Sequence, residues 1–378
     1  MEKTTGIDRA RFLAGTAAVG AAALLPAGAA RATGRRGQRP HRGLRRHGVV
    51  HTVGAGETPG TAWSDARMRA DIRAVRDGLH ADTVDVTGDG VERLTATAAE
   101  AAERGLHVWL QPTLGDAPRR DILDHLAETG RFAERLRRQG AGVELSAGCE
   151  FWLFVPGILP GDTVLERVEN RMKGNYGPVR MQRELDRFTA KAAQVGRSVF
   201  HGRLSYAAAQ DDVVDWSLFD VIGIDYYSYF RQRQDYVREL RQYQRWGKPV
   251  AITEFGTCTF RGAPEAGGMG WNIVDYDKDP PEIRGNVVRS ERTQARYLTG
   301  LLDVFESMDL YAAMAFEFVT ADAPHRPDDP LHDLDMASYS ITKAIKDRPD
   351  DPGSGWHWEP KEAFHALAAR YRVAGQRQ

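Results

Sequence analysis

The chain has 378 residues, of which 42% are hydrophobic, so it is long enough for one barrel-sized domain or two ordinary domains. Its 51 Lys and Arg residues nearly balance 52 Asp and Glu, and the formal net charge of −1 gives no general reason to expect nucleic acid or a membrane as partner. The two cysteines, Cys149 and Cys258, follow different predicted strands, so we expect free thiols and no disulfide.

The N-terminal segment predicts export. Residues 12–25 form an Ala-rich apolar run that is too short to span a bilayer, and small residues at 27–32 offer cleavage sites. The sequence Asp8-Arg9-Ala10-Arg11-Phe12-Leu13 is similar to a twin-arginine motif with Ala10 at the second arginine, which leaves both the Tat and the Sec route open. We predict a signal peptide at 1–32, a basic solvated linker at 33–47 and a barrel domain at 48–378 of an exported protein, secreted or associated with the cell wall. Contact of the arginine-rich linker with an anionic wall polymer or membrane is the alternative interpretation.

From Val49 onward, short apolar runs alternate with amphipathic stretches. The apolar runs predict strands at 49–53, 83–87, 107–111, 143–150, 198–204, 219–225, 249–254 and 311–318. The amphipathic stretches predict helices at 64–79, 91–104, 119–139, 180–195, 232–246, 290–308 and 361–372, with a short polar connection at 207–216. Long irregular segments follow the fourth strand (151–177), the seventh (257–289) and the eighth.

Eight strands alternating with helices predict an α/β fold, a single (β/α)8 TIM barrel. The connections before the strands are short and those after strands four, seven and eight are long, which places the irregular sequence on one face, as in barrel enzymes. The alternative is a doubly wound open sheet. Gly54 and Gly56 after the first strand lack a third glycine at the required place, so the dinucleotide-binding fingerprint is absent.

Two predicted strands deliver a glutamate to their C-terminal ends. The seventh reads Lys248-Pro249-Val250-Ala251-Ile252-Thr253-Glu254-Phe255-Gly256, and the fourth reads Val143-Glu144-Leu145-Ser146-Ala147-Gly148-Cys149-Glu150. Strands four and seven lie nearly opposite each other in an eight-stranded barrel, so both glutamates are expected to face one space. A proton donor and a second carboxylate are what glycosidic bond cleavage needs. The alternative is that each glutamate pairs with an arginine or caps a loop.

These motifs resemble the large clan of retaining (β/α)8 glycoside hydrolases that carry catalytic glutamates on strands four and seven. The resemblance implies that Glu254 is the nucleophile and Glu150 the acid/base. It also implies that a tyrosine of Asp225-Tyr226-Tyr227 on strand six hydrogen-bonds the nucleophile. Nearly the whole mature chain also resembles actinobacterial barrel proteins often labelled abortive infection proteins, on the motifs Trp109-Leu110-Gln111-Pro112, Gly157-Ile158-Leu159-Pro160-Gly161, Val214-Asp215-Trp216 and Leu334-Asp335-Met336-Ala337-Ser338.

The chain departs from the clan pattern at three places. Cys149 stands where an asparagine commonly precedes the acid/base, Asp85 is on a strand that often ends with an arginine, and Phe316-Glu317-Phe318 replaces a tryptophan platform. These departures keep open a second hypothesis, a non-catalytic barrel that binds a glycan or a cell-surface partner.

Further side chains near strand ends suit a carbohydrate site, which combines aromatic platforms with hydroxyl-binding groups. We expect substrate-binding roles for His51, Gln111, Cys149, Trp152, Asp225, Tyr226, Tyr227, Trp271, Phe316 and Glu317. Glu317 can bind a hydroxyl, raise the pKa of a neighbouring acid or pair with Arg261. The His and Asp residues after strand eight have no recognised metal spacing. The sequence therefore predicts a monomer acting on carbohydrate, with no metal, no cofactor, no nucleic acid and no stable membrane insertion once the signal is cleaved.

Overall fold

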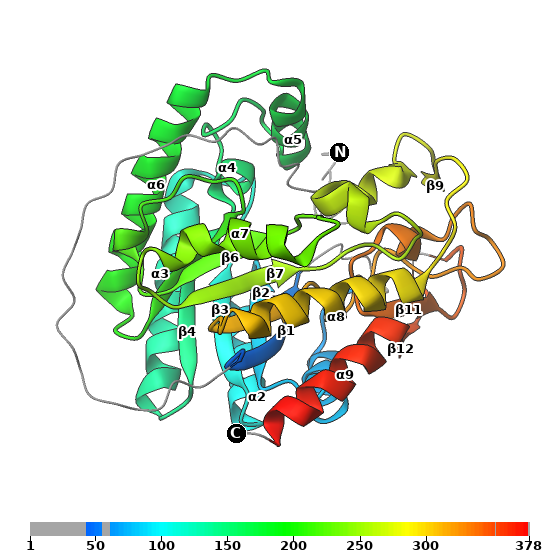
Figure 1. Cartoon of the computed structure of the whole chain (residues 1–378), viewed down its shortest axis with the longest axis horizontal. Helices are drawn as coiled ribbons and strands as arrows, with labels where there is room; N and C mark the ends of the chain where they lie inside the picture. Colours follow the sequence, from blue (N-terminus) through cyan, green and yellow to red (C-terminus); the bar gives the residue numbers. More distant parts are fainter. Residues whose placement is uncertain (1–42, 55–60, 352, 377–378) are drawn as a thin grey trace.

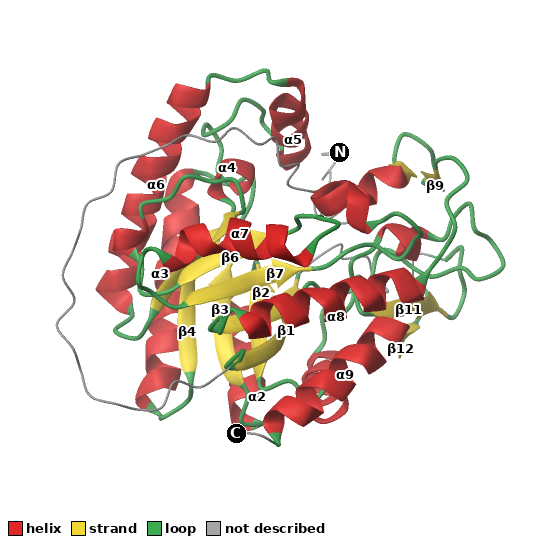
Figure 2. Cartoon of the chain, viewed as in Figure 1, coloured by secondary structure: helices red, strands yellow, loops and turns green. Residues whose placement is uncertain are grey.

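The computed structural model describes residues 43–54, 61–351 and 353–376. Eight parallel strands close into a barrel in the order β1-β10-β7-β6-β5-β4-β3-β2, with helices packed around the outside (Figures 1 and 2). The predicted (β/α)8 barrel is therefore confirmed. The predicted signal peptide and most of the basic linker lie outside the described residues, and β1 begins at Arg46, two residues before the predicted domain.

The barrel strands are short and almost entirely buried, which is why they read as apolar runs in the sequence. Their bounds are β1 Arg46–Val53, β2 Thr83–Gly88, β3 His107–Pro112, β4 Val143–Cys149, β5 Leu204–Ala209, β6 Ile222–Tyr226, β7 Val250–Phe255 and β10 Ala312–Ala315. Two small antiparallel hairpins stand outside the barrel, β8 Val274–Asp275 with β9 Glu282–Ile283, and β11 Thr342–Lys346 with β12 Trp356–Pro360.

The helices bury one face each against the barrel. Their bounds are α1 Asp65–Arg73 (continued by a π-helical turn, Ala74–Gly78), α2 Val91–Glu103, α3 Arg119–Arg138, α4 Phe151–Phe154, α5 Val164–Lys173, α6 Pro178–Val199, α7 Arg233–Gln244, α8 Glu291–Ser307 and α9 Glu362–Gly375. Short 3₁₀ turns occupy Trp216–Leu218, Pro264–Ile273 and Leu334–Ala337. Among the described residues, no helix has both the length and the apolar character needed to cross a membrane.

The fifth strand differs from its prediction. Strand five was expected at 198–204, but α6 continues to Val199, and β5 covers Leu204–Ala209. The strand therefore overlaps its prediction only at Leu204 and extends into the segment 207–216, which was expected to be a polar connection. Three consecutive alanines have low strand propensity, and here burial between β4 and β6 overrides that preference. The connection from β5 to β6 carries only the 3₁₀ turn Trp216–Leu218.

The segment 151–177 is more regular than expected, because it contains α4 and α5. Helix α5 begins with a capping box, in which the Thr163 side chain accepts from the Glu166 backbone and the Glu166 carboxylate accepts from the Thr163 backbone. Arg167 is wholly buried in this segment and donates to the Leu153 carbonyl at 2.6 Å and to the Gly161 carbonyl at 3.1 Å. The long connection after β4 is thus fixed in place over the barrel.

Register shifts mark the strand ends that carry the two glutamates. Between β6 and β7, Ile224 pairs with Ile252 but Asp225 pairs with Glu254, so one residue, Thr253, is added on β7. A similar shift lies between β4 and β5, from Ser146 to Cys149. Such bulges change the direction of side chains at the end of a strand. Both shifts therefore act at the C-terminal ends of the strands, next to the candidate site.

Candidate active site

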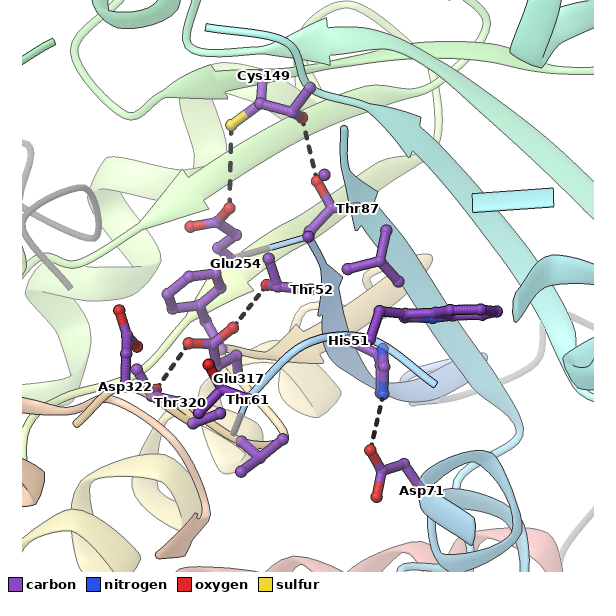
Figure 3. Close-up of a pocket in the computed structure, with 18 of the residues that line it drawn as sticks. His51, Thr52, Thr61, Asp71, Thr87, Cys149, Glu254, Glu317, Thr320 and Asp322 are labelled. Carbon is purple, nitrogen blue, oxygen red and sulfur yellow. Dashed lines mark hydrogen bonds and ion pairs between the residues drawn. The ribbon is translucent and has the colours of Figure 1, made fainter. Parts of the chain in front are cut away.

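A pocket of about 1220 Å³, open solvent at its mouth included, lies at the C-terminal ends of the barrel strands. Sequence reasoning proposed twelve site residues in all, and the structure brings seven of them to the pocket wall: His51, Cys149, Glu150, Tyr227, Glu254, Phe316 and Glu317. Figure 3 shows Glu254 directed toward Cys149, with Glu317 next to Thr52 and Thr320 and with His51 paired to Asp71. Both expected catalytic glutamates thus face one cavity.

The remaining five proposed residues, Gln111, Trp152, Asp225, Tyr226 and Trp271, do not line the pocket. Gln111 is buried and donates to Thr87 Oγ1 at 3.2 Å, and Asp225 is buried beneath Cys149. The Trp152 ring lies 4.1 Å from the Arg171 guanidinium, and the Trp271 ring packs near Tyr276.

The adjacent tyrosines of strand β6 point in different directions. Tyr226 donates to Glu239 Oε2 at 2.6 Å on the outer side of the barrel, whereas Tyr227 donates to Glu254 Oε2 at 2.6 Å in the pocket. The hydroxyl that contacts the expected nucleophile therefore belongs to Tyr227. Its ring is held by edge-on packing against Phe316 and Tyr339.

Glu254 is half-buried at the end of β7, and two groups hydrogen-bond to it. Tyr227 binds Oε2, and the Cys149 thiol lies 3.9 Å from Oε1. Burial raises the pKa of Glu254 to about 7, although the hydrogen bond from Tyr227 lowers it and the nearby charge of Glu317 raises it. Of the three roles considered for Glu317, the effect on a neighbouring pKa is thus present.

Glu150 follows β4 in a left-handed backbone conformation, with φ 32° and ψ 61°. This region is unfavourable for a residue with a Cβ atom, and such outliers cluster at functional sites. The side chain is buried, and burial raises the pKa of Glu150 well above its usual range. The charges of Glu254 and Asp212 raise it further, and Arg171 lowers it. Glu150 is therefore suited to hold a proton at neutral pH.

Cys149 and Asp225 form the floor beneath the two glutamates. The Cys149 sulfur lies 3.5 Å from Asp225 Oδ2, and Thr253 donates to Asp225 Oδ1 at 2.7 Å. Burial raises the pKa of Cys149, as do the charges of Asp225 and Glu254. Burial likewise raises the pKa of Asp225.

One carboxyl group inside the barrel was named in the sequence as a departure from the clan pattern but was not proposed as a site residue. Asp85 on β2 is wholly buried, and neither of its oxygens has a hydrogen-bond partner in the described part of the chain. Burial raises the pKa of Asp85, and the charge of Glu254 raises it further. A charged residue inside the apolar run Val84-Asp85-Val86 was the signal that could have identified it.

One wall of the pocket also escaped prediction. Arg67 lies over the Trp356 ring at 4.2 Å, and both residues line the cavity beside His51. Arg67 precedes the second strand and Trp356 belongs to the hairpin β11–β12, so neither stands at a barrel strand end.

The acidic loop after β10, the eighth barrel strand, brings His325, Asp333 and Asp335 together. Positive side chains already compensate these acids, because Asp335 pairs with Lys361 at 2.9 Å and with Arg289 at 2.8 Å, and Arg289 also reaches Asp333 at 3.2 Å. This cluster is an ion-pair network that joins the loop to the C-terminal part of the chain.

Comparison with solved structures finds the same barrel in a GH113 β-1,4-mannanase, with a TM-score of 0.55 and 13% identity over 87% of this chain and 99% of that chain. The GH113 β-mannanase AaManA from Alicyclobacillus acidocaldarius, in complex with ManMIm, gives 0.53 and 15% identity, over 87% of this chain and 98% of its own. Bacteroides uniformis β-glucuronidase 2 gives 0.52 and 13%, over 88% of this chain and 35% of its own.

At these identities, the matches establish a fold shared with glycoside hydrolases. No protein-family model and no curated protein matches the sequence. The resemblance to actinobacterial barrel proteins therefore stays a prediction.

Proposed function

We propose that the chain is a retaining glycoside hydrolase that acts on a β-linked glycan, with Glu254 as nucleophile and Glu150 as general acid/base. One observation carries the proposal: glutamates from β4 and β7 face the same pocket at the catalytic end of the barrel, and Tyr227 holds one of them at 2.6 Å. The fold shared with glycoside hydrolases supports it.

In the first step, the Glu254 carboxylate attacks the anomeric carbon while the Glu150 proton passes to the leaving glycosidic oxygen. The C–O bond to the leaving sugar breaks, and a glycosyl ester forms on Glu254. Tyr227 orients the carboxylate through Oε2, and burial favours the protonated form of Glu150 that this step requires.

In the second step, the Glu150 carboxylate removes a proton from water, and that water attacks the anomeric carbon of the glycosyl ester. The ester bond breaks, and Glu254 is released as a carboxylate. Two inversions at one carbon give a product with the configuration of the substrate.

The test is a hydrolysis screen over β-mannan, galactan, xylan and β-glucan with the wild type, followed by Glu254→Ala and Glu150→Ala on the best substrate. Each substitution is expected to lower kcat/KM by at least about 10³-fold, because each removes a group that acts in the transition state. An aryl glycoside with added azide separates the two roles. The Glu254→Ala variant is expected to give a glycosyl azide of inverted configuration, and Glu150→Ala one of retained configuration.

Glu239→Gln is the matched control, because Glu239 also accepts a tyrosine hydroxyl at 2.6 Å but lies outside the barrel. It is expected to keep wild-type activity. Full activity of either catalytic variant, or azide products of the opposite configurations, would contradict the assignment.

The alternative is a barrel that binds a glycan without cleaving it. The observations that favour it are Cys149, where the clan pattern has an amide, and the buried carboxyl of Asp85 near Glu254. Binding on a glycan array, without product release from the bound glycan, would support this alternative and exclude the first.

We also propose that the chain acts outside the cytoplasm, on the basis of the export signal predicted at residues 1–32. Detection of the chain in culture medium or cell-wall fractions, and its loss when that segment is deleted, tests this part.

A further inference from the structure

Three potential metal-ligand atoms converge at the wall of the pocket. The Cys149 sulfur lies 3.5 Å from Asp225 Oδ2 and 3.9 Å from Glu254 Oε1, and one ligand atom from each residue falls within 4.8 Å of the other two. A tetrahedral zinc site has Zn–S near 2.3 Å and Zn–O near 2.1 Å, which separates sulfur and oxygen ligands by about 3.6 Å. The two observed sulfur–oxygen distances are close to this separation between ligand atoms.

Each of the two carboxylates is already oriented by a hydroxyl group on its other oxygen. Thr253 donates to Asp225 Oδ1 at 2.7 Å, and Tyr227 donates to Glu254 Oε2 at 2.6 Å. These contacts leave Oδ2 and Oε1 directed at the sulfur. Outer hydrogen bonds of this kind are what fixes ligating carboxylates in metal sites.

Asp85 gives a second, independent indication of a ligand. It is wholly buried, its oxygens have no hydrogen-bond partner among the described residues, and Glu254 is close enough to raise its pKa. Side chains alternate along a strand, so Asp85 shares the inner face with Thr87, which lines the pocket. An isolated carboxyl group is costly to bury, and a nearby cation would offset that cost.

No described lysine or arginine provides this compensation. Within residues 43–54, 61–351 and 353–376, no ion pair to a basic side chain involves Asp85, Asp225 or Glu254 at 4.0 Å or less. The His325 cluster differs in this respect, since Lys361 and Arg289 neutralise it.

We propose that Cys149, Asp225 and Glu254 bind a divalent transition metal ion of the zinc class, on the same side of the barrel as the buried Asp85. One sulfur and two oxygen ligands suit a borderline ion such as Zn²⁺ or Co²⁺ better than Mg²⁺ or Ca²⁺. On binding, the thiol releases its proton to solvent as the metal–sulfur bond forms, and so does each ligating carboxyl group that is protonated beforehand, as its metal–oxygen bond forms. No electron is transferred.

This site overlaps the one proposed for hydrolysis. A metal ion on Oε1 takes up the carboxylate assigned as nucleophile, so it acts as a reversible inhibitor; this consequence alone depends on the proposed function. Cys149 thereby gains a role that the amide of the clan pattern does not have.

The test uses the full chain, treated with a chelator and then titrated with Co²⁺. A thiolate bound to Co²⁺ gives an intense near-ultraviolet charge-transfer absorption, which a carboxylate does not give. We expect this band to saturate at one equivalent and to be removed by added Zn²⁺. Cys149→Ser is expected to abolish it, and Thr253→Val to weaken Co²⁺ binding about 10- to 100-fold, as loss of an outer-shell contact does.

Cys258→Ser is the matched control, because Cys258 is also buried and free but donates to the Ala337 carbonyl at 3.1 Å, away from the site. It is expected to keep the band. Absence of the band in the wild type overturns the proposal, whether or not any variant folds. Loss of the band in Cys258→Ser overturns it as well. In the first case, Cys149 serves only as a hydrogen-bond donor.

The readout is independent of turnover. Hydrolysis is therefore measured on the metal-free chain. Hydrolysis there, with no band after Co²⁺ is added, rejects the metal site alone. The band after Co²⁺ is added, with no hydrolysis of any glycan by the metal-free chain, supports the metal site and rejects the proposed function.

Discussion

Replacing Tyr227 by phenylalanine removes a single oxygen atom and tests whether its contact with Glu254 supports catalysis. The change removes the hydroxyl that donates to Glu254 Oε2 at 2.6 Å and keeps the ring that packs against Phe316 and Tyr339. A hydrogen bond to a charged group contributes about 1.5–3 kcal/mol, which corresponds to a loss of roughly 10- to 150-fold in kcat/KM. Tyr227 contacts the nucleophile, so we expect most of the loss in kcat and little change in KM.

Tyr226→Phe is the natural control. It removes a hydroxyl from the neighbouring residue, with the same 2.6 Å contact to a glutamate, but on the outer side of the barrel. We expect it to reduce stability and to leave kcat/KM within about threefold of the wild type, since no group in the pocket is changed. The assay is initial-rate kinetics on the best substrate of the screen, with thermal denaturation of each variant. Equal losses of activity in both variants, or none in Tyr227→Phe, would refute the reasoning.

Two further predictions concern stability. Asp335→Ala leaves the wholly buried Lys361 without its counter-ion, whereas Arg289 keeps Asp333. Breaking this buried pair is expected to cost about 3–5 kcal/mol and, at roughly 0.7 kcal/mol/K for a barrel of this size, to lower Tm by about 4–7 °C. An equal change in the partly exposed Asp329→Ala would contradict this. Burial raises the pKa of Asp212 to about 7, so the folded chain keeps a proton there that the unfolded chain releases near pH 4. The stability that this bound proton contributes is present at low pH and is lost as pH rises toward 7, by at most about 4 kcal/mol. Asp212→Asn is therefore expected to flatten the fall in Tm over this range. A Tm profile of the variant that runs parallel to that of the wild type would count against this prediction.

The fold could be predicted because each barrel strand is buried on both faces and each helix on one. These two periodicities are visible in sequence, and they located seven of the eight strands. Strand β5 escaped because Leu204–Ala209 ends in alanines, whose strand state comes from pairing with β4 and β6. Helix α5 was missed although Thr163 and Glu166 carry a capping signature.

The site was predictable where a side chain stands at a strand end, as Glu150 and Glu254 do. It was less predictable where a bulge intervenes. Thr253 is the extra residue on β7, between the residues that pair with Ile224 and with Asp225, and its side chain donates to Asp225. Strand alternation alone does not predict this contact. The choice between Tyr226 and Tyr227 likewise depends on backbone direction at the end of β6.

The buried carboxyl group of Asp85 has a consequence for engineering. A side chain that is wholly buried and unpartnered among the described residues lowers stability, so Asp85→Asn or Asp85→Val belongs to the changes that commonly raise a melting temperature. A chain optimised for stability alone would not keep an acid at that position. Thermostable variants of this barrel obtained by random selection should therefore accumulate changes at this position first. Their loss of ligand affinity, compared with their gain in Tm, would measure how much stability the chain gives up for binding.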